Sequence, residues 1–330
     1  MKTHLKRSPF IAVIILTASL FSFAQSSGKS IIDEKNVRAE MGFLASDAMQ
    51  GRGSGTIFER VAAEYIGSQF MQFGLEPAGE IGVDGKPTYV QTVPFKSRRT
   101  GAEGKTWNAM GKITGTDKAL ASEVILLTSH LDHLGVRDTA PGDDKIFNGA
   151  DDDASGSVAV LELARVIGSG KRPKRTVYFV CFGSEEAGGY GATYFVNNMP
   201  FQKDKLVANL EFEMIGRPDT KVKADELWLT GYERSNLGPE LAKRGAKLVQ
   251  DPHPEENFFQ RSDNIQLARA GIIAHTVSSF GLHTDYHQAS DEIKTIDFTH
   301  MTQSINSMVK PVEWLINSDF KPTWNEGKKP

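Results

Sequence analysis

Runs of apolar residues alternate with segments of helical periodicity over most of the chain. Strand-like runs, several of them apolar throughout, predict strands at 124–128, 176–182, 207–214, 227–230 and 272–277. Apolar residues at helical spacing predict helices at 37–44, 57–73, 155–167, 191–197, 237–244, 262–270 and 299–317. Pro311 is expected to kink or divide the last helix. Apolar strands that alternate with helices predict a mostly parallel sheet with helices on its faces.

The predicted fold class is therefore α/β: a single-domain three-layer sandwich, with a mostly parallel mixed sheet covered by helices. A chain of 330 residues can bury one large core or two modest ones, and no shift in composition indicates a second domain. The segment Gly51-Arg52-Gly53-Ser54-Gly55 is too irregular for a phosphate-binding loop and is predicted to be a surface turn.

The first 24 residues have the pattern of a signal peptide. Basic side chains near the start precede an apolar run over 9–23, and Ser22-Phe23-Ala24 offers a cleavage site. The alternative is a membrane anchor, although the apolar run is short for a span. We therefore predict a signal peptide at 1–24 and a catalytic domain at 25–330. The protein is expected in the periplasm or outside the cell, with no membrane association after signal removal.

Composition narrows the classes of partner. The formal net charge is −3 at pH 7, so there is no broad electrostatic reason to bind nucleic acid or an anionic membrane. The single cysteine, Cys181, excludes an internal disulfide and a site built from several thiolates. Cys181 ends an apolar run and is predicted to be a small buried core residue.

Imidazoles and carboxylates follow four of the predicted strands, and a further acidic group precedes the helix at 155–167. These residues are His130, Asp132 and His133; Glu185 and Glu186; Glu211 and Glu213; His283, Asp285 and His287; and Asp151, Asp152 and Asp153. Because the carboxyl ends of parallel strands meet at one edge of a sheet, these side chains are expected to converge. Imidazole and carboxylate without thiolate suit Zn²⁺, and a shared carboxylate would hold two ions for hydrolysis.

The motifs His130-Leu131-Asp132, Gly-Ala-Asp-Asp-Asp-Ala-Ser-Gly at 149–156, Glu185-Glu186 and Tyr286-His287 occur in a characteristic order. Over about 37–298 the chain resembles the co-catalytic zinc exopeptidases of the bacterial leucyl aminopeptidase type. That family also includes glutamate carboxypeptidase II and the glutaminyl cyclases. The resemblance implies two zinc ions per chain, held by His130, Asp152, Glu186, Glu213 and His287. It implies that Asp152 bridges both ions and that the peptide bond between Asp152 and Asp153 is cis.

The resemblance also implies roles for neighbouring side chains. Asp132 orients His130 by accepting its other ring proton. Glu185 is the general base, which takes a proton from the metal-bridging water and passes it to the leaving amine. Tyr286 lies beside the scissile carbonyl, where it stabilises the developing oxyanion. Arg261 lies near the amino terminus of the substrate.

The chain departs from the family pattern at Glu213. The family commonly has an aspartate before a Met-hydrophobic-Gly turn, whereas Glu213 precedes Met214-Ile215-Gly216 here. Alternation along a strand allows Glu211 and Glu213 to point to the same side, and only the family turn favours Glu213. About thirty residues separate Phe95 from Val124, so the inserted domain of larger relatives is not expected.

The implied function is that of a metallo-aminopeptidase, which hydrolyses amino-terminal residues from peptides through a metal-bridging hydroxide. Because Glu213 stands where the family commonly has an aspartate, carboxypeptidase or dipeptidase activity on the same scaffold remains an alternative. Glutaminyl-cyclase-like acyl transfer is opposed by Tyr286, because that subgroup usually has tryptophan before the last histidine. A non-catalytic metal-binding relative is opposed by the intact Glu185. The oligomeric state, the physiological metals and the side-chain preference are not determined by the sequence.

Four other histidines and Asp151 are predicted to have roles outside the metal site. His133 could bind a metal, but one histidine per loop suffices, and a structural role is favoured. His253, His275 and His300 are also predicted to be structural. Asp151 is interpreted as a charge at a helix start.

Overall fold

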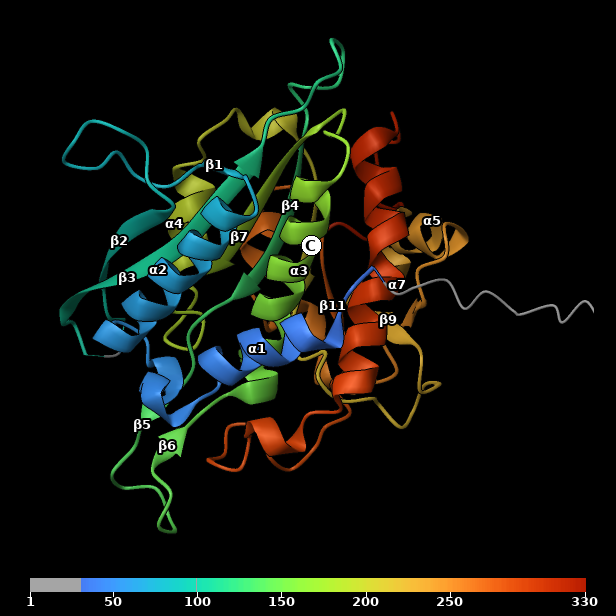
Figure 1. Ribbon diagram of the computed structural model, residues 1–330. Coiled ribbons are helices and arrows are strands. Elements are labelled where there is room, and N and C mark those ends of the chain that lie inside the picture. Colours follow the sequence, from blue (N-terminus) through green and yellow to red (C-terminus); the bar gives the residue numbers. More distant parts are fainter. Residues whose placement is uncertain (1–30, 99) are drawn as a thin grey trace, which may run out of the picture. The chain divides into compact units, whose positions relative to one another are not determined.

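The computed structural model describes residues 31–98 and 100–330 (Figure 1). The predicted signal peptide at 1–24 lies outside these residues. Within the described ranges, none of the helices combines the length and the hydropathy that a membrane crossing requires.

The apolar runs form the centre of one sheet. These strands are β4 (Val124–His130), β7 (Thr176–Phe182), β8 (Leu206–Phe212) and β11 (Ala274–Ser278). β4 runs parallel to both β7 and β8, and β8 runs parallel to β11. β4, β7 and β11 are buried at every position, as expected of strands that are covered on both faces.

The edges of the sheet are antiparallel or short. β3 (Glu103–Ile113) pairs antiparallel with β7, and β1 (Glu76–Pro77) and β2 (Val90–Lys96) pair antiparallel with β3. On the other side, β9 (Leu227–Leu229) is antiparallel to β11, and β10 (Leu248–Gln250) is parallel to β9. The strand order is β1-β3-β7-β4-β8-β11-β9-β10, with β2 on β3. β5 (Gly135–Val136) and β6 (Ile146–Phe147) form a separate hairpin. The sheet is therefore mixed, with a parallel centre.

Helices cover both faces of the sheet. Figure 1 shows α1 (Glu34–Leu44), α2 (Ile57–Gln72), α3 (Gly156–Ser169) and α7 (Phe298–Asn317) on the near face. The far face is covered by α4 (Tyr190–Asn197) and α6 (Asn264–Arg269), and α5 (Leu237–Lys243) packs beside β10 and α7. Ile125 and Leu127 of β4 belong to the core under the near helices, whereas Val124 and Leu126 belong to the core under α4 and α6. This alternation is the two-residue period of a strand, and it confirms the three-layer prediction.

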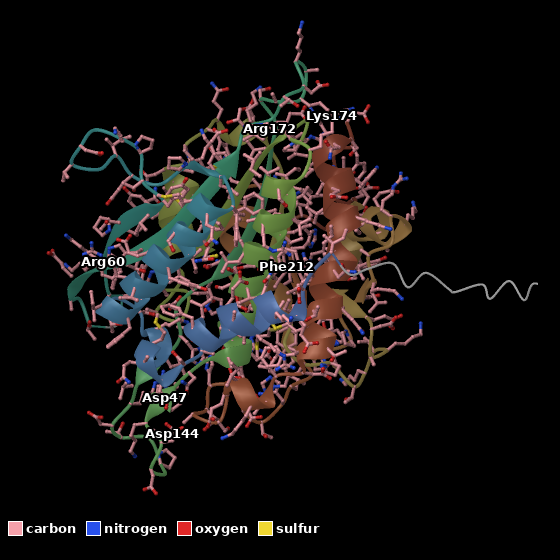
Figure 2. All side chains as sticks on the ribbon, viewed as in Figure 1. Asp47, Arg60, Asp144, Arg172, Lys174 and Phe212 are labelled. Carbon is pink, nitrogen blue, oxygen red and sulfur yellow. The ribbon has the colours of Figure 1, made fainter. Side chains whose placement is uncertain are left out.

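Two predictions from the pattern need adjustment. α7 runs through Pro311 as a single helix of 20 residues, so it is not divided there. The segment at 51–55 is not a surface turn, because Arg52 is only 1% exposed and Gly51 and Gly53 are also buried. The basic residues Arg172 and Lys174, in the loop before β7, are exposed and are labelled towards the upper end of Figure 2.

The carboxyl ends of β4, β7, β8 and β11 open on the same edge of the sheet. Phe212, the last residue of β8, is 1% exposed and lies near the centre of the molecule in Figure 2. Side chains that directly follow these strands are therefore expected to gather at this edge of the sheet.

Candidate metal centre

Donor side chains come from the ends of four neighbouring strands and from the turn before α3. His130 is the last residue of β4, and Glu213 directly follows β8. Glu186 lies shortly after β7, and His287 lies in the loop after β11. Asp152 belongs to the turn that leads into α3. The fold therefore brings together all five residues that were predicted to hold metal ions.

Asp152 lies between two groups of donors. Its Oδ1 is 3.2 Å from His130 Nε2, and its Oδ2 is 3.2 Å from His287 Nε2. Glu186 Oε1 is 3.1 Å from the same His287 nitrogen. On the other side, ligand atoms of His130, Asp152 and Glu213 all lie within 4.8 Å of one another. A carboxylate whose two oxygens face different donor groups has the arrangement of a bridging ligand.

The donor set fits zinc. His130 Nε2 and His287 Nε2 make no hydrogen bond to any described residue, although each lies close to a carboxylate oxygen. Ligand atoms that bind one tetrahedral zinc ion at about 2.0–2.2 Å are roughly 3.3 Å apart, which is close to the distances seen here. Imidazole and carboxylate donors without thiolate also suit zinc.

The turn that carries Asp152 is tied to the strand ends through Asp153. Asp153 Oδ2 accepts a hydrogen bond from the backbone N–H of His130 at 3.2 Å. Its Oδ1 accepts from the N–H groups of Gly156 at 2.9 Å and Met214 at 3.1 Å. The peptide bond between Asp152 and Asp153 is cis, as the resemblance implies. Asp153 thus fixes the bridging residue relative to β4 and β8.

A second set of charges lies behind the same turn. The Asp291 carboxylate accepts from the N–H groups of Asp151 at 3.0 Å and Asp152 at 3.1 Å. Arg217 lies 3.4 Å from Asp291, and His283 Nε2 is 2.9 Å from Asp151 Oδ2. Asp151 is fully buried, so it is part of this network and not merely a charge at a helix start. The motifs gave no role to Asp291, which lies outside them, or to Arg217, although Arg217 directly follows the turn at 214–216.

The Asp132 carboxylate holds the turn that carries the candidate base. It accepts hydrogen bonds from the N–H groups of Glu185 at 3.0 Å and Glu186 at 3.4 Å, and from the Ser54 hydroxyl. His130 Nδ1 lies 3.7 Å from the Asp132 carboxylate and 3.2 Å from the carbonyl oxygen of the same residue. The nearer partner for the second ring nitrogen is thus the main chain of Asp132 rather than its side chain.

Arg52 clamps the loops that carry the donors. Its guanidinium donates to the carbonyl oxygens of Leu131 at 2.8 Å, Asn148 at 2.7 Å and Gly149 at 2.9 Å. A fourth bond reaches the carbonyl of Leu44 at the end of α1, at 2.6 Å. These bonds join the loop after β4 to the turn before α3. The sequence signal was only a Gly-Arg-Gly triplet, which allows the backbone to approach closely.

Glu185 lies beside the donors and in a group of carboxylates. Burial raises its pKa well above the ordinary value; His130 opposes this shift, and the negative charges of Asp263, Glu186 and Glu213 add to it. Burial also raises the pKa of Glu213 to about 8. Such shifts follow when several carboxylates share a site that holds too little positive charge, as expected where cations bind.

Glu211 and Glu213 have different neighbours. Glu211 Oε2 accepts a hydrogen bond from the N–H of Asn264, at the start of α6. Glu213 lies with His130 and Asp152. The geometry therefore favours Glu213 as the ligand, and it leaves Glu211 as a buried carboxylate beside the centre.

Tyr286 and Arg261 line a pocket next to Glu213. The Tyr286 ring stacks on the His287 ring, with centroids 3.9 Å apart. Arg261 lies over the Phe258 ring at 4.8 Å, and its Nη1 donates to Glu256 at 2.9 Å. The other lining residues are Met214, Trp228, Thr230, Phe258, Thr276, Ser278 and Phe280. Four of the ten lining residues are aromatic, and Glu213 belongs both to the pocket and to the donor group.

The remaining histidines fall into two classes. His253 Nε2 bonds the Asp219 carboxylate at 2.7 Å, and His275 bonds Ser235 and the Thr230 carbonyl, each at 2.7 Å. His300 Nδ1 lies 2.9 Å from the Ala224 carbonyl. These contacts are structural, as predicted. His133, in contrast, is placed with Asp152 and Glu186 in a second group of possible metal ligands.

Comparison with known sequences places these residues in a family. The model of Peptidase family M28 matches residues 108–310. Leupeptin-inactivating enzyme 1 of Streptomyces exfoliatus is 31% identical over 301 residues, which cover 86% of this chain and 62% of that protein. Aminopeptidase YwaD of Bacillus subtilis is 24% identical over 207 residues, 61% of this chain and 43% of that protein. The chain thus spans less than two thirds of the length of these relatives.

Solved structures share the fold. The aminopeptidase from Aneurinibacillus sp. strain AM-1 superposes with a TM-score of 0.65 at 16% identity, over 87% of this chain and 94% of that chain. Glutaminyl cyclase from Porphyromonas gingivalis superposes with a TM-score of 0.66 at 17% identity, over 87% of this chain and 100% of that chain. One fold thus serves proteins named for hydrolysis and for cyclisation, so the reaction has to be argued from the site.

Proposed function

Since the chain belongs to peptidase family M28, we propose that it is a two-zinc aminopeptidase that removes amino-terminal residues from peptides. One observation carries this proposal. Asp152 presents its two oxygens to separate groups of donors, and a free glutamate, Glu185, lies beside them. A bridged pair of ions with an adjacent base is the arrangement used for hydrolysis.

His130, Asp152 and Glu213 would hold one zinc ion, and Asp152, Glu186 and His287 would hold the other. When bound, the zinc ions supply Lewis acidity, which polarises a carbonyl and lowers the pKa of water. Asp291 accepts a bond from the N–H of Asp152, and the adjacent Asp153 accepts one from the N–H of His130, so both would hold Asp152 in place. Their part is to keep the donors preorganised for the ions.

Glu185 is proposed as the general base. Its backbone N–H donates to the Asp132 carboxylate, so the turn that carries Glu185 is held by a residue of the loop after β4. Burial raises its pKa, and the charge of bound ions would oppose that shift. Such opposing influences suit a group that takes a proton and later returns it to the leaving amine.

A free amino terminus is the favoured substrate feature. Behind Glu185 and Glu213, Asp263 is 1% exposed and neither of its oxygens has a hydrogen-bond partner among the described residues. Glu211 Oε1 is likewise without a partner in that part of the chain. Buried, unpaired carboxylates are unfavourable unless a cation neutralises them. An α-ammonium group supplies that charge, whereas a blocked amine does not.

Tyr286 and Arg261 are proposed to contact the substrate. Tyr286 is packed against His287, which would place its ring beside the reacting carbonyl, where the hydroxyl could stabilise the oxyanion. Arg261 lines the same pocket and is held by Glu256, so it is available to position the amino-terminal residue.

The test compares peptides with free and acetylated amino termini, using zinc-loaded protein. We expect cleavage of the free-amine peptides only, and Glu185→Gln should abolish turnover while both zinc ions remain. Loss of zinc together with turnover would make Glu185 a ligand and overturn its assignment. Cyclisation of a peptide with amino-terminal glutamine, with about one zinc ion per chain, would support the cyclase alternative instead.

Export is proposed from the amino-terminal pattern alone. The basic start, the apolar run and the small residues before Gln25 support removal of a signal peptide. Amino-terminal sequencing of protein recovered outside the cytoplasm should begin near Gln25. Recovery of the intact terminus in the membrane fraction would indicate an anchor.

A further inference from the structure

His133 has the same relation to the carboxylates of the centre as His287. Its Nδ1 is 3.0 Å from Glu186 Oε1 and 3.7 Å from Asp152 Oδ2. His287 Nε2 approaches the same two oxygens at 3.1 Å and 3.2 Å. We infer that His133 Nδ1 is a further ligand of the zinc ion held by Glu186 and His287. This inference rests on the proposed two-zinc site, and it reverses the structural role that the sequence favours.

The direction of the ring nitrogen distinguishes a ligand from a hydrogen-bonded histidine. His133 Nδ1 makes no hydrogen bond to any described residue, despite its 3.0 Å approach to Glu186. His130 Nε2 and His287 Nε2 share this property. Two donors that bind one ion point at the ion and not at each other, and they stand roughly 3.3 Å apart. His253, which bonds Asp219 directly at 2.7 Å, shows the contrasting case.

The two imidazoles are also placed as a pair around one ion. The ring centroids of His133 and His287 are 5.8 Å apart, with the ring planes inclined by 65°. Imidazoles on one tetrahedral zinc ion, each with a Zn–N distance of about 2.0–2.1 Å, hold their centroids roughly 5 Å apart. The side chain of His133 is 0% exposed, and an imidazole without partners is unfavourable in such a place. A bound ion gives its Nδ1 a partner.

The backbone holds this ring in position. A Cβ atom at Gly149, whose φ is +59°, would lie 2.4 Å from His133 Cγ, so the glycine allows the turn before α3 to pack against the ring. The N–H of His133 donates to the carbonyl of Arg52 at 3.2 Å. Both neighbours restrict the ring to the side of the carboxylates.

With His133, the two zinc ions would differ in the number of protein ligands. His133, Asp152, Glu186 and His287 would give one ion four donors, whereas His130, Asp152 and Glu213 would give the other three. Zinc sites with three protein ligands leave a position for water or substrate. Glu213 also lines the pocket with Tyr286, so substrate is expected to approach on the side of His130 and Glu213.

The test counts zinc-bound imidazoles by NMR of protein labelled with ¹⁵N-histidine, in the zinc-free and zinc-loaded states. We expect three ring nitrogens with the shift of a zinc ligand in the wild-type protein, and two in His133→Ala. Competition with a chelator should show that one of the two zinc affinities falls at least about 10-fold in this variant. The matched control is His253→Ala, another buried histidine beside a carboxylate, which should keep three zinc-bound nitrogens.

Two zinc-bound imidazoles in the wild-type protein, or unchanged affinities in His133→Ala, would overturn the inference. If the variant does not fold, the wild-type spectrum still decides the question. Failure of the proposed function is separable from failure of this inference. Three zinc-bound imidazoles without peptide hydrolysis would reject only the activity, and hydrolysis with two would reject only the role of His133.

Discussion

Replacement of Arg52 by methionine should weaken both the fold and the metal centre. The substitution removes four charged hydrogen bonds of 2.6–2.9 Å. It leaves the carbonyls of Leu44, Leu131 and Asn148 unpaired, whereas the Gly149 carbonyl still accepts from the N–H of Ala154 at 3.2 Å. Methionine fills part of the volume with an apolar chain, so the main loss is polar rather than a cavity.

The magnitude follows from those bonds. A buried carbonyl without a partner costs about 1–3 kcal/mol, and a lost hydrogen bond to a charged group costs at least about 1.5 kcal/mol. Three unpaired carbonyls and the lost bond to Gly149 therefore correspond to about 4.5 kcal/mol at the lower bound. Removal of the buried cation relieves a desolvation penalty, which offsets part of this loss. The negative charges of Asp132, Asp153 and Asp291 near the guanidinium limit that relief. We therefore expect the unfolding free energy to fall by about 3–5 kcal/mol.

The assay is denaturant unfolding of zinc-free protein, together with zinc affinity measured by chelator competition. Because Arg52 joins the loop of His130 to the turn of Asp152, zinc affinity should also fall, by about 10–100-fold. Arg175→Met is the matched control. Arg175 is fully buried, and it bonds Glu123 and the Leu315 carbonyl, which are not part of the metal centre. This variant should lose stability and keep its zinc affinity. A destabilised Arg52→Met with unchanged zinc affinity would refute the role of the clamp.

Three more outcomes are expected. Asp263→Asn should raise KM for free-amine peptides by about 10-fold with a smaller change in kcat. The substitution removes a carboxylate proposed to bind the substrate ammonium group, a loss of about 1.4 kcal/mol. An effect on kcat alone would contradict this role. Burial lowers the pKa of His275 from 6.5 to about 4, so the unfolded chain takes up the proton first. The lowered pKa of His275 contributes about 3 kcal/mol to the free energy of unfolding. This contribution is fully present above pH 6.5 and is lost as pH falls towards 4. In zinc-free protein, the difference in unfolding free energy between wild type and His275→Gln should shrink over that range, and a constant difference would be against it. Gly149→Ala places a Cβ 2.2 Å from the Asp152 carbonyl oxygen at a φ of +59°. This variant should lower the free energy of unfolding by at least about 1 kcal/mol and weaken zinc binding. Gly245 also has a positive φ, but a Cβ there meets no atom within 4 Å, so Gly245→Ala should keep its zinc affinity.

The central strands were predictable because they are buried on both faces. An apolar run such as that of β7 contains no face for polar residues, so its limits at Thr176 and Phe182 are visible in the sequence. β3 escaped prediction because polar side chains such as Lys105 and Lys112 interrupt its apolar positions, near the edge of the sheet. Such a strand is recognised only from the partners on either side.

The order of strands and motifs in the sequence was enough to propose a zinc centre, because parallel strands that alternate with helices end at one edge of the sheet. It supplied residue types and their succession, and with them His130, Asp152, Glu186 and His287 as neighbours. Sequence order contains no distances, however. A strand period of two leaves Glu211 and Glu213 equivalent, and within the sequence only the family turn favours Glu213. The folded chain separates them by their neighbours, since Glu211 accepts a bond from Asn264 and Glu213 lies with His130.

Only the tertiary structure shows what His133 and Arg52 contact. The sequence places His133 among several possible donors and Arg52 in a glycine-rich segment, and it does not say which residues they meet. The roles arise from contacts across long stretches of chain: His133 with Glu186 after β7, and Arg52 with the carbonyl of Gly149 before α3. Burial then fixes each role, because a polar group removed from water needs a partner, and the folded chain determines which partner is within reach.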